Sequence, residues 1–258
     1  MKIIVLVKEV PDTYGDRKLD LETGLADRAA NDAVPDEIGE RALEVALTYA
    51  DKNADTEIVV MSVGPNTVPG TLRKALAMGA ASAVHVMDDA LMGADLGLTG
   101  EVLAAAIRRT GFDLVLAGNL STDGSGGVIP SIVAELLGVP AATNLSSVEI
   151  SEGAVAGVRA VENGSVNVRA DLPAVVSITE ALPDARFPNF KGIMAAKKKP
   201  FETLTANDLG INAEDESKGR SIVVAVSERP ARAAGVKIID EGDAASQLAD
   251  FLVQNRLV

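Results

Sequence analysis

The chain has 258 residues and a formal net charge of −13; it is 47% hydrophobic and only 3% aromatic, with one histidine and no cysteine. The absence of cysteine excludes disulfides, thiolate catalysis and cysteine-ligated iron–sulfur clusters, and the negative charge argues against binding to nucleic acid. No stretch reaches the roughly 18 apolar residues that span a bilayer, and the apolar start at 3–7 meets charged residues rather than a cleavage site. We therefore expect a cytoplasmic protein without direct membrane insertion.

The first half of the chain alternates apolar runs with segments of helical periodicity. Continuous apolar runs are typical of parallel strands buried on both faces, and Gly79, Gly111 and Gly138 close three of the helical segments. Strands are predicted at 3–7, 57–63, 83–87 and 114–117, and helices at 36–50, 71–78, 98–107 and 129–137. This order predicts an α/β fold with a doubly wound, mostly parallel, Rossmann-like sheet.

A different pattern begins near Leu145. Alternating strands at 158–162 and 165–170 flank Asn163 and Gly164, which is a strong hairpin signal, and another strand is predicted at 172–178. The segment 201–258 is polar apart from a short run at 222–226 and an amphipathic helix expected at 244–256. Because these runs are too brief to form a core, we expect an α/β domain at 1–200 and an extended C-terminal arm at 201–258 that packs on a partner. The alternative is a partly disordered C-terminus.

Three loops follow strand ends, where a doubly wound sheet forms its ligand crevice: 9–15, 64–66 and 118–127. The third contains four glycines and precedes a helix. Glycines let backbone N–H groups approach an anion, and the helix N-terminus adds partial positive charge. Asp123 suits either a ribose hydroxyl or the capping of the loop. The loop therefore predicts nucleotide binding, and a purely structural loop is the alternative.

Several catalytic motifs are missing. No GxGxxG follows the first strand, no GxxxxGK[ST] occurs anywhere, and one histidine cannot build a Ser-His site or a metal cluster. His85 lies in an apolar run and is expected to pack in the core. We expect no catalytic residue, no metal site and a nucleotide with a structural role.

A basic run, Lys197 to Lys199, follows an apolar loop at 187–194. This combination is typical of a docking patch with a charged rim, although a charge run is also an ordinary solvated face.

The sequence resembles the electron-transfer flavoprotein (ETF) β-subunit family over essentially its whole length. The resemblance rests on the opening 4–12, on Glu40 with 42–44, and on 63–65 with 72–80. Its most specific stretches are 161–176, which includes the hairpin, and 186–199, which resembles the recognition loop and lysine run of the family.

The resemblance implies a subunit of a heterodimer rather than an enzyme. The α subunit of such a heterodimer holds most of a redox-active FAD, and the β subunit holds AMP. The pair carries electrons from acyl-CoA and other flavin dehydrogenases toward ETF-quinone oxidoreductase. Electron-bifurcating members hold a second FAD in place of AMP, and this remains an alternative. The rival from another class is a universal-stress-type ATP-binding module.

The resemblance also implies two sets of site residues. The expected nucleotide contacts are Leu6, Asp36, Glu37, Ile38, Gly39, Val63, Gly118, Asn119, Ser121, Thr122, Asp123, Gly124, Ser125, Gly126, Gly127, Val128 and Ile129. The expected docking residues, within a recognition loop at 183–199, are Phe190, Lys191, Ile193, Met194, Lys197, Lys198 and Lys199. Many members have Asn-Pro where this chain has Asp36 and Glu37, and leucine where it has Phe190.

Overall fold

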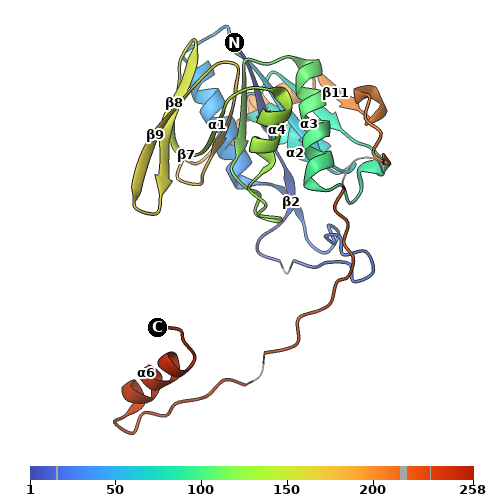
Figure 1. The fold of residues 1–258 in the computed structure, drawn as a ribbon. Helices are drawn as coiled ribbons and strands as arrows, with labels where there is room; N and C mark the ends of the chain where they lie inside the picture. The colour runs from blue at the N-terminus through green and yellow to red at the C-terminus, as the bar shows by residue number, and fades with distance from the viewer. Residues whose placement is uncertain (16, 216–219, 233) are drawn as a thin grey trace. The chain divides into compact units, whose positions relative to one another are not determined.

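The chain divides into two units, Met1–Ala225 and Val226–Val258, in a computed structural model that describes residues 1–15, 17–215, 220–232 and 234–258 (Figure 1). The larger unit contains the sheet and its covering helices. The smaller unit contains the helix α6 (Ala244–Gln254), which confirms the amphipathic helix expected there.

The larger unit is built on a nine-stranded sheet with the order β11-β5-β4-β1-β6-β10-β7-β8-β9. From β11 to β7 every neighbouring pair is parallel, and β8 and β9 add an antiparallel extension. The strands are β1 (Lys2–Leu6), β4 (Glu57–Val63), β5 (Ser82–Val86), β6 (Leu114–Gly118), β7 (Ala141–Ile150), β8 (Ala154–Val161), β9 (Gly164–Asp171), β10 (Ala174–Ile178) and β11 (Phe201–Leu204). The predicted doubly wound, mostly parallel sheet is confirmed.

Four helices cover the sheet, two on each face. The helices α1 (Glu37–Ala50) and α2 (Pro69–Met78) share one apolar cluster with the sheet, and α3 (Leu96–Thr110) and α4 (Ile129–Leu137) share the other. In Figure 1, α3 and α4 lie in front of the sheet. The central strand β1 serves both clusters because its side chains alternate: Ile3 and Val5 face α1, and Ile4 faces α3.

The strand order fixes where a ligand crevice forms. From β1 the chain moves through α1 to β4 and through α2 to β5, and then returns through α3 to β6 on the other side of β1. The direction of winding therefore reverses between β1 and β6. Their carboxyl ends define the switch point, at which doubly wound sheets bind ligands.

The hairpin is confirmed, but its turn lies one residue earlier than predicted. Val161 already pairs with Gly164, so the two connecting residues are Glu162 and Asn163. Gly164 has φ of +150°, a conformation that side chains disfavour, and it begins β9 rather than completing the turn.

The segment at 201–204 also differs from the sequence expectation. It was expected in the C-terminal arm, but it forms β11 and pairs with β5 at the edge of the sheet. Phe201 places its ring edge-on to His85, with the ring centroids 6.5 Å apart. His85 is buried, and its Nε2 lies 3.0 Å from the carbonyl oxygen of Gly64, as expected for a core residue. The sheet therefore extends beyond the predicted boundary at residue 200.

Two loops predicted as irregular contain regular structure. A two-stranded sheet pairs β2 (Glu9–Pro11) with β3 (Ala33–Pro35), and the recognition segment contains the helix α5 (Phe190–Ala196). Single 3-10 turns lie at Asp89–Leu91 and Asn207–Leu209. None of the helices in the described part of the chain is both long and apolar enough to span a bilayer.

Candidate functional site

Most of the predicted nucleotide contacts gather at the switch point. The register of the sheet pairs Leu6 of β1 with Ala117 of β6, so the loops that leave both strands start side by side. The backbone N–H of Asn119 donates to the carbonyl oxygen of Ile178 over 2.8 Å, which holds the glycine-rich loop next to β10. The segment 36–39 adjoins both loops through the contacts of Asp36, Ile38 and Gly39 described below.

Asp36 joins the two loops with a buried carboxylate that is only 3% exposed. Its Oδ1 accepts a hydrogen bond from the backbone N–H of Ile38 over 3.0 Å and thereby caps α1. Its Oδ2 accepts from the backbone N–H and the hydroxyl of Thr122, over 2.7 and 2.9 Å. Both oxygens are thus engaged within the protein. Asp36 therefore links the first turn of α1 to the glycine-rich loop, and its contact with a nucleotide stays a prediction.

Two glycines allow α1 to begin directly against the strand ends. A Cβ on Gly118 would lie 2.9 Å from Cγ2 of Ile38, which is closer than real Cβ contacts, and 3.3 Å from the backbone carbon of Ile38, which is a tight contact. A Cβ on Gly39 would lie 3.6 Å from the Cα of Val7, an ordinary contact. The first turn of α1 is therefore held against both β1 and β6, and a side chain at Gly118 would require Ile38 to shift.

Asp123 caps the glycine-rich loop, the second of its two predicted roles. Its Oδ1 accepts hydrogen bonds from Nζ of Lys8 over 2.7 Å and from the backbone N–H of Gly124 over 2.6 Å, and Nη2 of Arg28 lies 4.0 Å from Oδ2. Burial raises the pKa of Asp123, but hydrogen bonds from Lys8, Ser121 and Gly124 outweigh burial and lower it to about 2. Neither Lys8 nor Arg28 was among the residues predicted for the site. Lys8 has a signal in the sequence because it follows the first apolar run at 3–7, whereas no local signal marks Arg28.

The remaining part of the loop offers unused hydrogen-bonding groups. In the described portion of the chain, the backbone N–H groups of Gly126, Gly127 and Val128 donate to no protein acceptor, and α4 begins without a side-chain cap. Oδ1 of Asn119 is buried and accepts no hydrogen bond there either. Free N–H groups at a helix N-terminus suit a phosphate, and a buried acceptor suits a hydroxyl or amino group. These groups fit a nucleotide.

The predicted docking residues lie elsewhere, on α5. Phe190 is 79% exposed, and Ile193 and Met194 are also exposed. The helix begins at Asn189, whose side chain accepts from the backbone N–H of Gly192. A Cβ on Gly192 would lie 2.2 Å from the carbonyl oxygen of Ala77, so this glycine lets α5 pack directly on α2. The exposed apolar side chains therefore stand on a fixed helix rather than on the expected loop.

Lys199 is less exposed than the other lysines among the predicted docking residues. Its Nζ donates to the carbonyl oxygens of Leu76 and Ala80 over 2.8 and 2.6 Å, at the end of α2. Burial lowers the pKa of Lys199. Lys197 and Lys198 are exposed, as is Lys191. Lys199 therefore anchors the docking segment, and only the other lysines can form a charged rim.

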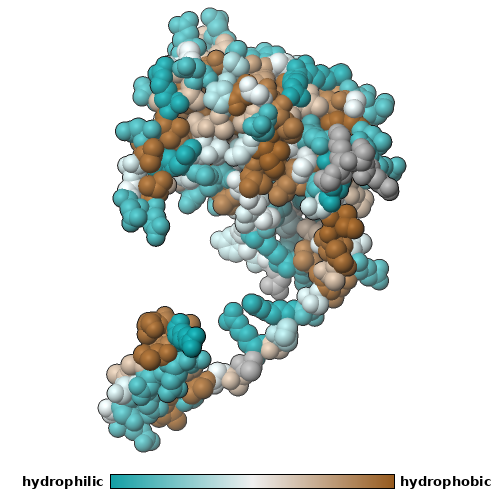
Figure 2. Space-filling view, in the orientation of Figure 1, coloured by the Kyte–Doolittle hydropathy of each residue, from teal (hydrophilic) through white to brown (hydrophobic). Residues whose placement is uncertain are grey.

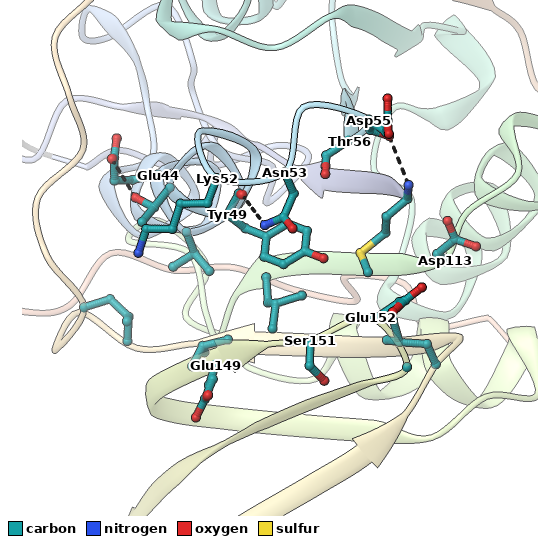
Figure 3. Close-up of a pocket in the computed structure, with 18 of the residues that line it drawn as sticks. Glu44, Tyr49, Lys52, Asn53, Asp55, Thr56, Asp113, Glu149, Ser151 and Glu152 are labelled. Atoms are coloured by element: carbon teal, nitrogen blue, oxygen red, sulfur yellow. Dashed lines mark hydrogen bonds between the residues drawn. The ribbon is translucent and has the colours of Figure 1, made fainter.

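An open groove of about 1180 Å³ lies at the opposite, amino-terminal edge of the sheet (Figure 3). Two hydrogen bonds lie along it: the N-terminal ammonium of Met1 donates to the backbone oxygen of Asp55 over 3.1 Å, and Asp113 accepts from the backbone N–H of Lys2 over 2.6 Å. No cluster of potential metal ligands occurs among the described residues. The predicted nucleotide contacts lie at the other edge of the sheet, so we take the switch point as the candidate site.

Comparison with known proteins identifies a family that the chain resembles over most of its length. Residues 23–209 match the family model described as the electron transfer flavoprotein domain. The chain is 43% identical to the electron transfer flavoprotein subunit beta of Mycobacterium tuberculosis, with 99% of each chain covered. It is 35% identical to the protein of the same name from Syntrophomonas wolfei, with 98% of this chain and 96% of the relative covered. It is 34% identical to the caffeyl-CoA reductase-Etf complex subunit CarD of Acetobacterium woodii, with 83% and 82% covered.

We predict that Asp36→Ala lowers the free energy of unfolding by about 1–3 kcal/mol, because it leaves Thr122 and the first turn of α1 without their acceptor. Urea unfolding of the purified chain measures the loss. Glu37→Ala is the matched control, since Glu37 is exposed on the same turn, and it should change stability by less than about 0.5 kcal/mol. Equal losses for both variants would contradict the bridging role of Asp36.

We predict a pH-dependent contribution from Asp123. The lowered pKa of about 2 in the folded state, against an ordinary value near 3.8, stabilises the fold above about pH 4, and this stabilisation is lost as the pH falls toward 2. At pH 6 the free energy of unfolding of the native chain should exceed that of Asp123→Asn by about 1 kcal/mol after allowance for solvent screening. Urea unfolding of both chains between pH 6 and pH 3 measures this difference. A difference that does not shrink on acidification would refute the assignment.

Proposed function

The chain belongs to the electron transfer flavoprotein family as a β subunit, an electron-transfer subunit that pairs with an α subunit, and from this premise we propose its specific role. We propose that it binds AMP as a structural nucleotide and helps the α subunit hold a redox-active FAD. The heterodimer then carries electrons in the cytoplasm from acyl-CoA and other flavin dehydrogenases toward ETF-quinone oxidoreductase. The chain is an electron carrier subunit and not an enzyme in this proposal.

The nucleotide proposal rests on the unused groups at the switch point. The N–H groups of Gly126, Gly127 and Val128 would hold the phosphate at the start of α4, and Oδ1 of Asn119 would accept from the nucleoside. Asp36 and Asp123 would keep the loop in its binding shape, since their carboxylates are engaged within the protein. AMP supplies no redox chemistry when bound. Its proposed role is to complete the loop and hold α4.

A second candidate is an electron-bifurcating complex in which this site holds a second FAD in place of AMP. The observation in its favour is the likeness to a relative named as a subunit of a caffeyl-CoA reductase-Etf complex. Both candidates use the same N–H groups, because AMP is part of FAD. Family membership removes the universal-stress-type alternative.

The docking proposal rests on the exposed apolar side chains of α5. Phe190 would anchor a flavin dehydrogenase, with Ile193 and Met194 beside it and the exposed lysines at the rim. The helix is fixed to α2 through Gly192 and Lys199, so docking requires no ordering of the segment. A small apolar anchor gives a contact that exchanges rapidly, which an electron shuttle requires.

The role of the smaller unit is also a proposal. Its helix α6 exposes Leu248, Phe251 and Val253, and the unit has no buried residues of its own among those described. We propose that this arm, which begins after Ala225, packs on the α subunit. Burial on a partner would remove these apolar side chains from water.

Replacement of Gly126 by leucine should expel the nucleotide. A Cβ at Gly126 meets only Cδ2 of Leu96 at 3.7 Å, so the protein accepts it, but a larger side chain would enter the position proposed for the phosphate. Chromatography of the nucleotide released from the denatured heterodimer measures occupancy. Gly70→Leu is the control, because Gly70 has no atom within 4 Å of its Cβ position. Equal nucleotide content in both variants would place the site elsewhere.

Replacement of Phe190 by alanine should weaken docking. We expect the binding free energy with a reduced acyl-CoA dehydrogenase to weaken by about 2 kcal/mol, because Phe190 contributes apolar surface to a partner and not to the core. The flavin content should not change. The measurement is the electron-transfer rate at varied heterodimer concentration, together with the melting temperature. Val166→Ala, which truncates an exposed side chain on β9, is the control. A lower melting temperature with an unchanged electron-transfer rate would show that Phe190 packs in the fold, and it would contradict the docking proposal.

A further inference from the structure

The residues that precede the arm are fastened to α3 by an arginine fork. Nη1 of Arg220 lies 3.2 Å from Oε1 of Glu101, and Nη2 lies 3.2 Å from Oε2. The Arg220 side chain is only 17% exposed. Parallel N–H donors on one carboxylate fix the direction of the guanidinium as well as its position, so this pair constrains the chain more than a single contact would.

The next residue adds a second attachment at the N-terminus of α3. The backbone N–H of Ser221 donates to Oδ2 of Asp95 over 2.7 Å. The other oxygen of Asp95 accepts from the backbone N–H of Leu98 over 2.8 Å and caps α3. Asp95 therefore joins the start of a rigid helix to the chain that leads into the arm.

A third contact lies on the long loop between β2 and β3. A Cβ on Gly24 would lie 2.4 Å from Cγ1 of Val223, so the side chain of Val223 rests against this glycine. The flanking side chains point away from the unit: Ile222 is 82% exposed and Val224 is 91% exposed. Figure 2 shows apolar surface where the chain leaves the larger unit. The fastened segment thus presents two aliphatic side chains to solvent.

We propose that Arg220 is a positioning residue for binding of the α subunit. It clamps the segment 220–225 to α3 and presents Ile222 and Val224 to the α subunit. This inference rests on the proposed packing of the arm on that subunit. The α subunit is the occupant because the segment continues directly into the arm, which begins at Val226. Because the segment 220–225 is already held against α3, less conformational entropy is lost when the α subunit binds.

Displacement of the chain from the heterodimer tests this role. Heterodimers that contain variant chains are mixed with an excess of labelled wild-type chain, and the dissociation rate from the α subunit is measured. Arg220→Met should raise the rate about tenfold. Arg220→Lys should have an intermediate effect, since it keeps the charge but loses the fork. The charge-swapped pair Arg220→Glu with Glu101→Arg should restore most of the slow dissociation, which a loss of packing alone would not allow.

Arg109→Met is the matched control, because Arg109 pairs α3 with Glu202 of β11 and lies outside the clamp; its rate should stay within about twofold of the native rate. A chain that ends at Ala225 measures the contribution of the arm. If this shortened chain dissociates rapidly while Arg220→Met does not, or if the charge swap restores nothing, the clamp inference is overturned and the arm proposal stands. If the shortened chain dissociates as slowly as the full chain, the arm proposal fails and the clamp inference fails with it.

Discussion

The buried carboxylate of Asp36 is the constraint on which the candidate site depends. The chain winds in opposite directions on the two sides of the boundary between β1 and β6, so the segments that meet there belong to separate crossovers and need a link. Asp36 supplies it by accepting from the first turn of α1 and from Thr122 in the glycine-rich loop. Because a buried acceptor is costly to leave unpaired, the two oxygens of this carboxylate hold both the loop and the first turn of α1 in place. The N–H groups of 126–128 then remain for a ligand.

The two proposed tasks fall on different parts of the larger unit. The groups proposed to bind the nucleotide lie at the carboxyl ends of the strands, whereas α5 packs on the end of α2 that precedes β5, toward the amino-terminal edge. Lys199 fixes that end of the docking segment, and Arg186 fixes its start by pairing with Glu44 and Asp51 of α1 and its C-terminus. The exposed Phe190 therefore stands on a segment held at both ends. This separation supports a nucleotide that stabilises the subunit and a docking helix that meets redox partners independently.

Sequence patterns predicted those features that depend on local periodicity and missed those that depend on distant contacts. The strand at 57–63 and the helix at 129–137 match at both ends, because their apolar runs and flanking glycines or prolines are local signals. The strand β11 was missed because its four residues gain their pairing only from β5, more than a hundred residues away in the chain. The helix α5 was missed because a glycine interrupts its apolar pattern, although that glycine is what allows it to pack on Ala77. Nothing in a run of three lysines indicates that Lys199 alone reaches the carbonyl oxygens of α2.

We propose that the switch point of this β subunit holds a structural AMP beside an α subunit that carries the FAD. The most direct test is to co-express the chain with its α subunit, purify the heterodimer without added nucleotide, denature it, and quantify the released FAD and AMP against protein. We predict one FAD and one AMP per heterodimer. Two FAD and no AMP would contradict it and assign the bifurcating role, and a heterodimer with one FAD and no other nucleotide would contradict the assignment of the switch point as a binding site.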